Sequence, residues 1–147
     1  MSSQLNVDTI VDKAGSGGTN VKIANTSTYV SENSTTTQNA VQALCKAWYD
    51  IDGSGTASVL DSFNNASLTD NGTGDFTVTR ASAMNSTSYA VGAMSDFDGS
   101  DSRVVTVTSS EANTARTTTV IRHALQDTSA NGHDPNHFSA VIFGDLA

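Results

Sequence analysis

Apolar and polar residues alternate along much of this chain, which is the pattern of half-buried β-strands. Every second residue is apolar over 47–51, and Ala57, Val59 and Phe63, with Asp61 between them, continue this spacing after a DGSG turn. Asn71-Gly72 then provides the positive-φ turn that hairpins prefer, and residues 76–80 resume the alternation. The segment 46–80 therefore predicts a meander of antiparallel strands.

The second half of the chain continues with β-forming runs at residues 88–93, 104–108, 117–123 and 138–143, separated by Ser, Asp and Gly. About six to eight short strands spaced about ten residues apart are typical of an antiparallel β-sandwich. The core candidates are the large apolar and β-branched residues of these runs. They are Trp48, Phe63, Phe76, Val78, Tyr89, Val91, residues 117–122 and residues 140–143.

Residues 34–47 hold the only candidate helix, capped by Thr36 or Thr37. Val41, Leu44 and Trp48 fall on one face of it. A helix this short does not stand alone in water. It either packs around an axis with copies of itself, as the neck of a homotrimer, or lies on the sheet of its own domain.

Residues 1–30 read as an extended segment in which apolar residues alternate with polar ones, interrupted by the glycine-rich run 14–18. Such a segment has no core of its own and should dock on a partner. Its anchoring candidates are Leu5, Val7, Ile10 and Val11. The expected architecture is mainly β and homotrimeric, with an extended N-terminal arm (1–33), a short helix or neck (34–47) and an antiparallel β-sandwich (48–147).

Composition favours association of copies, because only 37% of the 147 residues are apolar and 6% aromatic. A chain of this kind buries little surface alone, and an interface between copies supplies more core. The net charge of −8 argues against nucleic-acid binding, which needs clustered Lys and Arg. No apolar run of about 18 residues suggests membrane insertion.

Candidate chemistry is sparse. A single cysteine, Cys45, excludes an internal disulfide and is best explained as a small buried apolar residue. No Ser/His/Asp order, phosphate-binding loop or HExxH motif is present, so we expect a protein that is not an enzyme and needs no cofactor.

One acidic segment nearly matches an EF-hand calcium loop. Asp50, Asp52, Ser54 and Asp61 take loop positions 1, 3, 5 and 12, and Gly55 takes position 6. An EF-hand also needs a helix on each side, whereas residues 62–79 are rich in Ser, Thr, Asn and Gly. The pattern favours a turn that binds no ion over a calcium site.

Two further polar clusters have ligand chemistry. One is SDFDGSDS, with Asp96, Asp98 and Asp101, whose oxygens suit calcium but whose composition is also that of an ordinary turn. The other is the loop 131–137, in which His133 and His137 are candidate metal ligands. Solvated loop histidines are the more economical interpretation.

A resemblance rests on four segments of the chain: KAWYDIDGSGT, DSFNNASLTDNGTGDFTVT, SYAVGAM and the final AVIFGD. Together with the opening LNVDTIVDKAG, they cover more than a third of the chain. The combination resembles a module of tail-fibre and other virion appendage proteins of marine tailed phages.

The resemblance implies a structural virion protein, assembled in the host cytoplasm and anchored to phage capsid or tail proteins through its N-terminal arm. In a short tail fibre or a head/tail appendage, distal loops would contact a host-surface glycan or an outer-membrane protein. The alternative within structural proteins is a capsid decoration, or cement, protein. Two hypotheses from outside the structural proteins are a calcium-binding module and a glycan-cleaving spike.

Overall fold

The computed structural model describes residues 27–30, 35–96, 103–107, 116–127 and 129–147. The chain divides into two units, Met1–Val41 and Gln42–Ala147. In the described part of the first unit, β1 (Thr28–Tyr29) pairs with β2 (Gln38–Asn39) in a two-residue antiparallel ladder. So short a ladder has little stability by itself.

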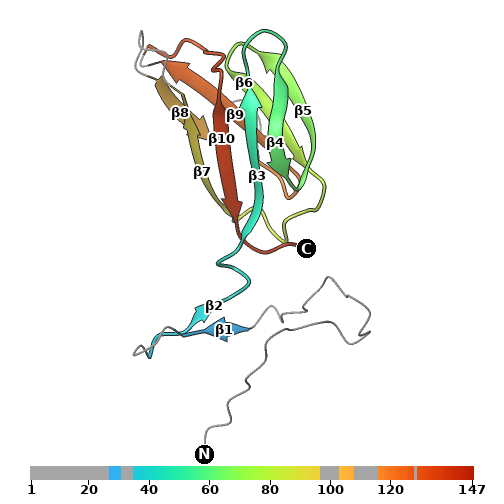
Figure 1. Ribbon diagram of the computed structural model, residues 1–147, viewed down its shortest axis with the longest axis vertical. Helices are drawn as coiled ribbons and strands as arrows, with labels where there is room; N and C mark the ends of the chain where they lie inside the picture. The colour runs from blue at the N-terminus through green and yellow to red at the C-terminus, as the bar shows by residue number, and fades with distance from the viewer. Residues whose placement is uncertain (1–26, 31–34, 97–102, 108–115, 128) are drawn as a thin grey trace, which may run out of the picture. The chain divides into compact units, whose positions relative to one another are not determined.

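The second unit contains two four-stranded antiparallel sheets (Figure 1). One sheet has the order β4-β3-β10-β7, and its strands are β3 (Cys45–Asp52), β4 (Ser58–Phe63), β7 (Ala90–Ser95) and β10 (Phe138–Phe143). The other has the order β5-β6-β9-β8, and its strands are β5 (Asn65–Gly72), β6 (Asp75–Arg80), β8 (Arg103–Val107) and β9 (Val120–Asp127). The prediction of a mainly β, sandwich-like antiparallel fold is confirmed.

The core lies between the sheets and is built from every second residue of the four central strands. This alternation follows from the two-residue period of a strand, which points successive side chains to opposite faces. The buried residues are Ala47, Tyr49 and Ile51 of β3, Phe76 and Val78 of β6, Ile121 and Leu125 of β9, and Phe138, Ala140 and Ile142 of β10. Each of the larger side chains contributes about 1.5–3 kcal/mol by leaving water.

Asn64 turns the chain from one sheet to the other in a single residue between β4 and β5. Its φ of 58° lies in the left-handed region, which asparagine tolerates better than most residues. The side-chain amide donates to the carbonyl oxygen of Lys46 at 3.0 Å, and its oxygen accepts from the backbone of Ser82 at 2.7 Å. These bonds fix the corner.

The tip of the β5–β6 hairpin packs against the loop that leads to β10. Gly74 (φ 72°) donates its backbone N–H to Asp134 Oδ1 at 2.7 Å and accepts from the N–H of Leu125 at 2.7 Å. A Cβ at Gly132 would lie 2.2 Å from the carbonyl oxygen of Thr73. The two backbones approach so closely that only glycine fits.

The helix expected over residues 34–47 is not found. Within 35–47, residues 38–39 form β2, a turn follows, and β3 begins at Cys45. The two-residue alternation of β3 begins inside the segment that was expected to be helical. A strand there forms hydrogen-bonded ladders with β10 and β4 on both sides, and this stabilises it more than the weak helical propensity of the segment stabilises a helix. No helix of a length and hydropathy suited to crossing a membrane occurs in the described residues.

Trp48 and Phe63 were predicted in the core, but they lie on the outer face of their sheet. Tyr49 is buried, so its neighbour Trp48 must point the other way, and Phe63 pairs with Trp48 across the strands. The phase of the alternation, rather than the size of the side chain, decides which residues are buried. Phe76, Val78 and Tyr89 are buried as predicted.

Candidate functional site

Apolar side chains are exposed on the outer face of the sheet β4-β3-β10-β7. The register aligns Phe63, Trp48, Val141 and Gly92 in one cross-strand row, here called the Trp48 row. Phe63 is 52% exposed and Val141 40% exposed, while Trp48 is half-buried. None of the four side chains carries a charge. The row therefore crosses all four strands as a continuous uncharged strip.

Further apolar residues extend this strip along the strands. Met94 of β7 is 76% exposed, and Leu60 of β4 and Phe143 of β10 are also exposed. We call the face formed by the Trp48 row with these three residues the apolar face. Single exposed apolar residues are normal on a soluble protein, but a contiguous group of this kind marks an interaction surface.

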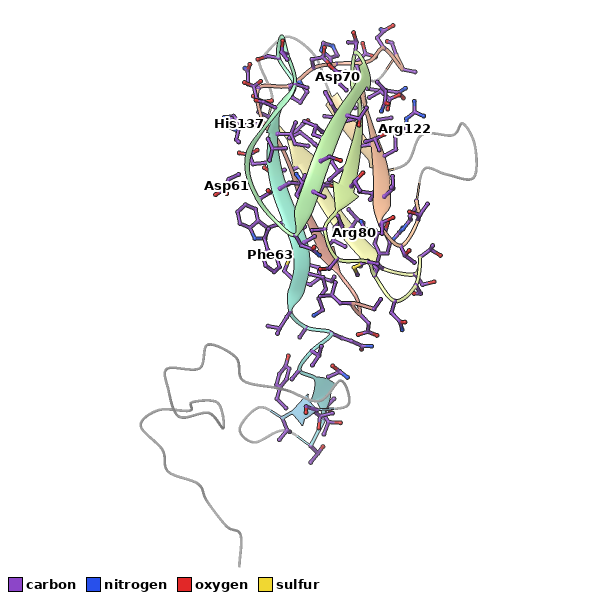
Figure 2. The ribbon with its side chains drawn as sticks, turned by 90° about the vertical axis from the view of Figure 1, so that its right-hand side faces the viewer. Asp61, Phe63, Asp70, Arg80, Arg122 and His137 are labelled. Carbon is purple, nitrogen blue, oxygen red and sulfur yellow. The ribbon has the colours of Figure 1, made fainter. Side chains whose placement is uncertain are left out.

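The outer face of the other sheet has the opposite character. Its corresponding row aligns Thr69, Thr77 and Arg122. Arg122 makes a two-pronged ion pair with Asp75, in which Nε lies 2.7 Å from Oδ1 and Nη2 contacts Oδ2. This ion pair lowers the pKa of Asp75. Figure 2 shows Arg122 on one side of the second unit and Phe63, Asp61 and His137 on the other.

An acidic row borders the Trp48 row on the apolar face. Here the register aligns Asp61, Asp50, Ser139 and Met94. Asp50 accepts from Ser139 Oγ at 3.0 Å and lies 3.0 Å from His137 Nδ1. The hydrogen bond and negative charge of Asp50 raise the pKa of His137. Asp50 and Asp61 thus place negative charge at one end of the apolar face.

The calcium-like segment forms the β3–β4 hairpin. Asp52 Oδ1 accepts from the backbone N–H of Ser54 at 2.8 Å and from its hydroxyl at 2.6 Å, which lowers the pKa of Asp52. Asp61 Oδ1 accepts from the N–H of Ser62 at 2.8 Å. Both carboxylates thus accept hydrogen bonds from backbone groups one or two residues further along the chain. Among the described residues no group of three or more His, Cys, Asp or Glu has the geometry of a metal site.

The loop 131–137 was considered for its two histidines as metal ligands, but its hydrogen bonds have structural roles. His133 uses its backbone N–H to bond the carbonyl oxygen of Leu125 at 3.0 Å, and Asp134 binds the hairpin tip at Gly74. His137 pairs with Asp50. In the other acidic cluster, Asp96 follows β7, whereas Asp98 and Asp101 lie outside the described residues.

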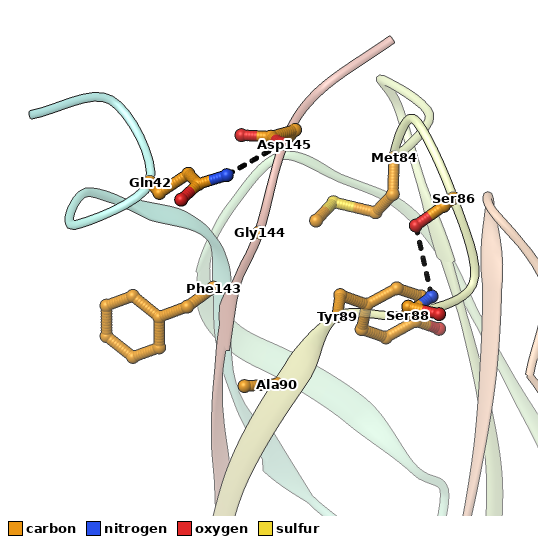
Figure 3. A pocket seen from close by; sticks show the side chains of 9 residues that line it. All are labelled: Gln42, Met84, Ser86, Ser88, Tyr89, Ala90, Phe143, Gly144 and Asp145. Atoms are coloured by element: carbon orange, nitrogen blue, oxygen red, sulfur yellow. Dashed lines mark hydrogen bonds between the residues drawn. The ribbon is translucent and has the colours of Figure 1, made fainter. Parts of the chain in front are cut away.

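A pocket of about 340 Å³ opens at the end of the second unit near the C-terminus (Figure 3). Its walls come from the residues before β3, the 84–90 segment and the end of β10. They include Gln42, Met84, Ser86, Tyr89, Phe143 and Asp145. Gln42 Nε2 donates to Asp145 Oδ2 at 3.1 Å across the pocket rim. The lining combines aromatic rings with hydroxyl, amide and carboxylate groups.

Tyr89 forms a rigid wall of this pocket. The guanidinium carbons of Arg116 and Arg80 lie 4.0 Å and 4.6 Å from the centroid of the Tyr89 ring, so both cations make cation–π contacts with it. Its hydroxyl lies 3.1 Å from the carbonyl oxygen of Thr117. Arg80 is 2% exposed and donates to the carbonyl oxygens of Thr117 and Thr118. The burial of Arg80 could have been predicted from the strand pattern, because residues 76, 78 and 80 lie on the same, inward face of β6.

His123 is fully buried between the sheets. Its Nε2 shares a hydrogen bond with the hydroxyl of Tyr49, and its ring packs edge-on against Phe138 at a centroid distance of 4.7 Å. Within the described part of the chain its Nδ1 has no hydrogen-bond partner. Burial lowers the pKa of His123 to about 3 and raises that of Tyr49 far above its ordinary value. Both groups are therefore neutral at physiological pH.

The predicted neck residues do not share a helical face, because no helix forms between residues 35 and 47. Leu44 is 57% exposed just before β3, and Trp48 lies on the apolar face. Val41 ends the first unit. The anchoring candidates Leu5, Val7, Ile10 and Val11 lie outside the described residues.

Comparisons with known proteins give no relative: no family model matches the chain, and no curated protein and no solved structure matches it.

Proposed function

We propose that this chain is a structural protein of a tailed-phage particle, a short tail fibre or a head/tail appendage involved in host attachment. It is made in the host cytoplasm and assembled into the virion. Its N-terminal arm docks on capsid or tail proteins, and copies associate, with a homotrimer as the expected assembly.

The observation that carries the proposal is the position of the appendage-like segments in the fold. KAWYDIDGSGT supplies most of β3, and DSFNNASLTDNGTGDFTVT supplies the second half of β4, all of β5 and most of β6. SYAVGAM supplies most of β7, and AVIFGD supplies most of β10. The resemblance therefore includes part of every strand in the sheet β4-β3-β10-β7 and two strands, β5 and β6, of the other sheet. It describes one folded unit rather than scattered short matches.

The division of the chain supports an anchored particle protein. The sandwich-like unit Gln42–Ala147 holds the buried core, whereas the described part of Met1–Val41 holds a single two-residue ladder. So short a ladder would gain stability by binding a partner. The anchoring candidates Leu5, Val7, Ile10 and Val11 belong to this first unit.

The pocket beside Tyr89 favours host attachment over capsid decoration. Its lining suits a saccharide, whose apolar ring face would stack on the exposed ring of Phe143 while its hydroxyls bond carboxylate and amide groups. A cement protein that only covers a seam needs no such pocket. With a net charge of −8, the chain disfavours strongly anionic glycans.

Host attachment is tested by comparing binding of the full chain to susceptible host cells with binding to emptied capsids. An attachment protein binds the cells, and replacing Asp145 by Ala weakens that binding. A cement protein binds the capsids, and the same replacement has no effect. Binding to neither surface would contradict both versions of the proposal.

A further inference from the structure

We infer that the apolar face joins copies of this chain, with the β4–β3 half of one copy packed on the β10–β7 half of the next. The inference rests on the proposed function for its biological setting, since that function requires copies to associate. It adds the surface, the residues and the arrangement through which they do so.

The steric pattern of the Trp48 row is self-complementary. Its large side chains, Phe63 and Trp48, lie in one half, and its small residues, Val141 and Gly92, lie in the other. A Cβ at Gly92 would meet only Val141 Cγ2, at 3.4 Å, so the face is hollow there. Packing unlike halves together places Phe63 over Gly92 and Trp48 over Val141. Opposing large with small residues is how two sheets interdigitate at about 10 Å separation.

The charges agree with this arrangement. The Trp48 row is uncharged, although the chain as a whole carries −8. In the acidic row, the same pairing sets Asp61 opposite Met94 and Asp50 opposite Ser139 of the other copy, so no carboxylate directly opposes another. A cationic partner would pair with the acidic row but would find no counter-charge along the Trp48 row, whose unlike halves instead match a second copy. A second copy is the better occupant.

The size of the face indicates modest affinity. Four strands about 4.8 Å apart and about six residues long cover roughly 400 Å² per copy, or roughly 800 Å² for the pair. Stable complexes usually bury at least about 1,200 Å². Copies held side by side on a particle meet at a much higher effective concentration, which makes a weak contact sufficient. If the apolar faces of two copies pack parallel to each other, both halves of each face are covered and the assembly closes as a dimer. If the two faces meet at an angle, each copy contacts two neighbours and the assembly closes as a ring of three.

Sedimentation velocity of the full chain between about 1 µM and about 500 µM tests this, because interfaces below the standard size belong to the weak, transient class. The mass should rise with concentration from the 15.2 kDa of one chain to that of two or three chains. Val141→Glu or Met94→Glu should weaken association about tenfold or more, since each buries an unpaired charge. The matched control Thr69→Glu, on the polar outer face, should associate like the wild type.

A size swap tests the pairing of unlike halves. Phe63→Gly leaves a gap and Gly92→Phe adds a clash, so each should weaken association, whereas the double variant should restore it. Thermal unfolding followed by circular dichroism confirms that each variant is folded. A wild-type chain that stays monomeric, glutamate variants that associate normally, or a double variant that is not restored would overturn the inference. A chain found in virions yet monomeric would overturn only this inference, and a chain that associates but is absent from virions would overturn only the proposed function.

Discussion

Acid should destabilise this protein through His123, and replacing His123 by Leu together with Tyr49 by Phe should remove that sensitivity. His123 is buried as a neutral ring whose pKa is about 3, against 6.5 for an accessible histidine. Unfolding releases it into water, where it takes up a proton below about pH 6.5. Between these two pKa values the unfolded chain binds one more proton than the folded chain. The free energy of unfolding therefore falls as the pH falls through this window.

The expected loss is about 3 kcal/mol between pH 8 and pH 4.5, because the slope approaches about 1.4 kcal/mol per pH unit once the unfolded histidine is fully protonated. Other titrating groups change the free energy of unfolding with a different sign or in a different pH range. The raised pKa of His137 gives stability that is present at low pH and lost as the pH rises through that pKa, which is the opposite sign. The lowered pKa values of Asp52 and Asp75 give stability that is lost only as the pH falls through the carboxylate range.

Urea unfolding of the wild type and of the double variant His123→Leu/Tyr49→Phe, followed by circular dichroism from pH 8 to pH 4.5, isolates this contribution. All other titrating groups are common to the two proteins and cancel in the difference. Removing both hydrogen-bond partners at once avoids leaving a buried hydroxyl unpaired, which by itself costs about 1–3 kcal/mol. The wild type should lose about 3 kcal/mol relative to the variant over this range. Parallel pH profiles would refute the reasoning.

Three further outcomes are expected. Gly74→Ala should lower the free energy of unfolding by more than about 2 kcal/mol, because its Cβ would lie 2.3 Å from the carbonyl oxygen of Leu125. Gly55→Ala, at a similar positive φ with no atom within 4 Å, should cost only about 1 kcal/mol, and equal losses in urea unfolding would contradict the argument. An NMR titration should place the pKa of His137 above its ordinary value, and Asp50→Asn should lower it; an unchanged value in that variant would exclude Asp50 as the cause. Calcium at millimolar concentration should leave the melting temperature unchanged relative to a chelator, and a rise would establish a cation site.

The strands were predictable because their signal is local. Ala47, Tyr49 and Ile51 occupy every second position of the strand, and they form the inward side of β3. Asn71-Gly72 lies at the end of β5, where the chain turns into β6. The helix over 34–47 was wrong because its few apolar positions fit a helical and a strand period about equally well.

The candidate site was less predictable because it depends on which strands become neighbours. The sequence shows Trp48, Phe63 and Val141 as apolar residues of strands, and all three were placed in the core. Only the order β4-β3-β10-β7 and its register bring them together in one outer row. Likewise, Arg80 and Arg116 meet at Tyr89 from separate segments, and spacing along the chain does not reveal that contact.

The most direct test of the account is to locate the chain in purified virions from cells that carry its gene. The proposal predicts that the chain copurifies with intact tailed particles and that antibodies against the sandwich-like unit label a tail or head appendage. It also predicts that replacing Leu5 and Val7 by Asp removes the chain from the particles while the protein remains folded. Absence of the chain from such virions would contradict the proposed function.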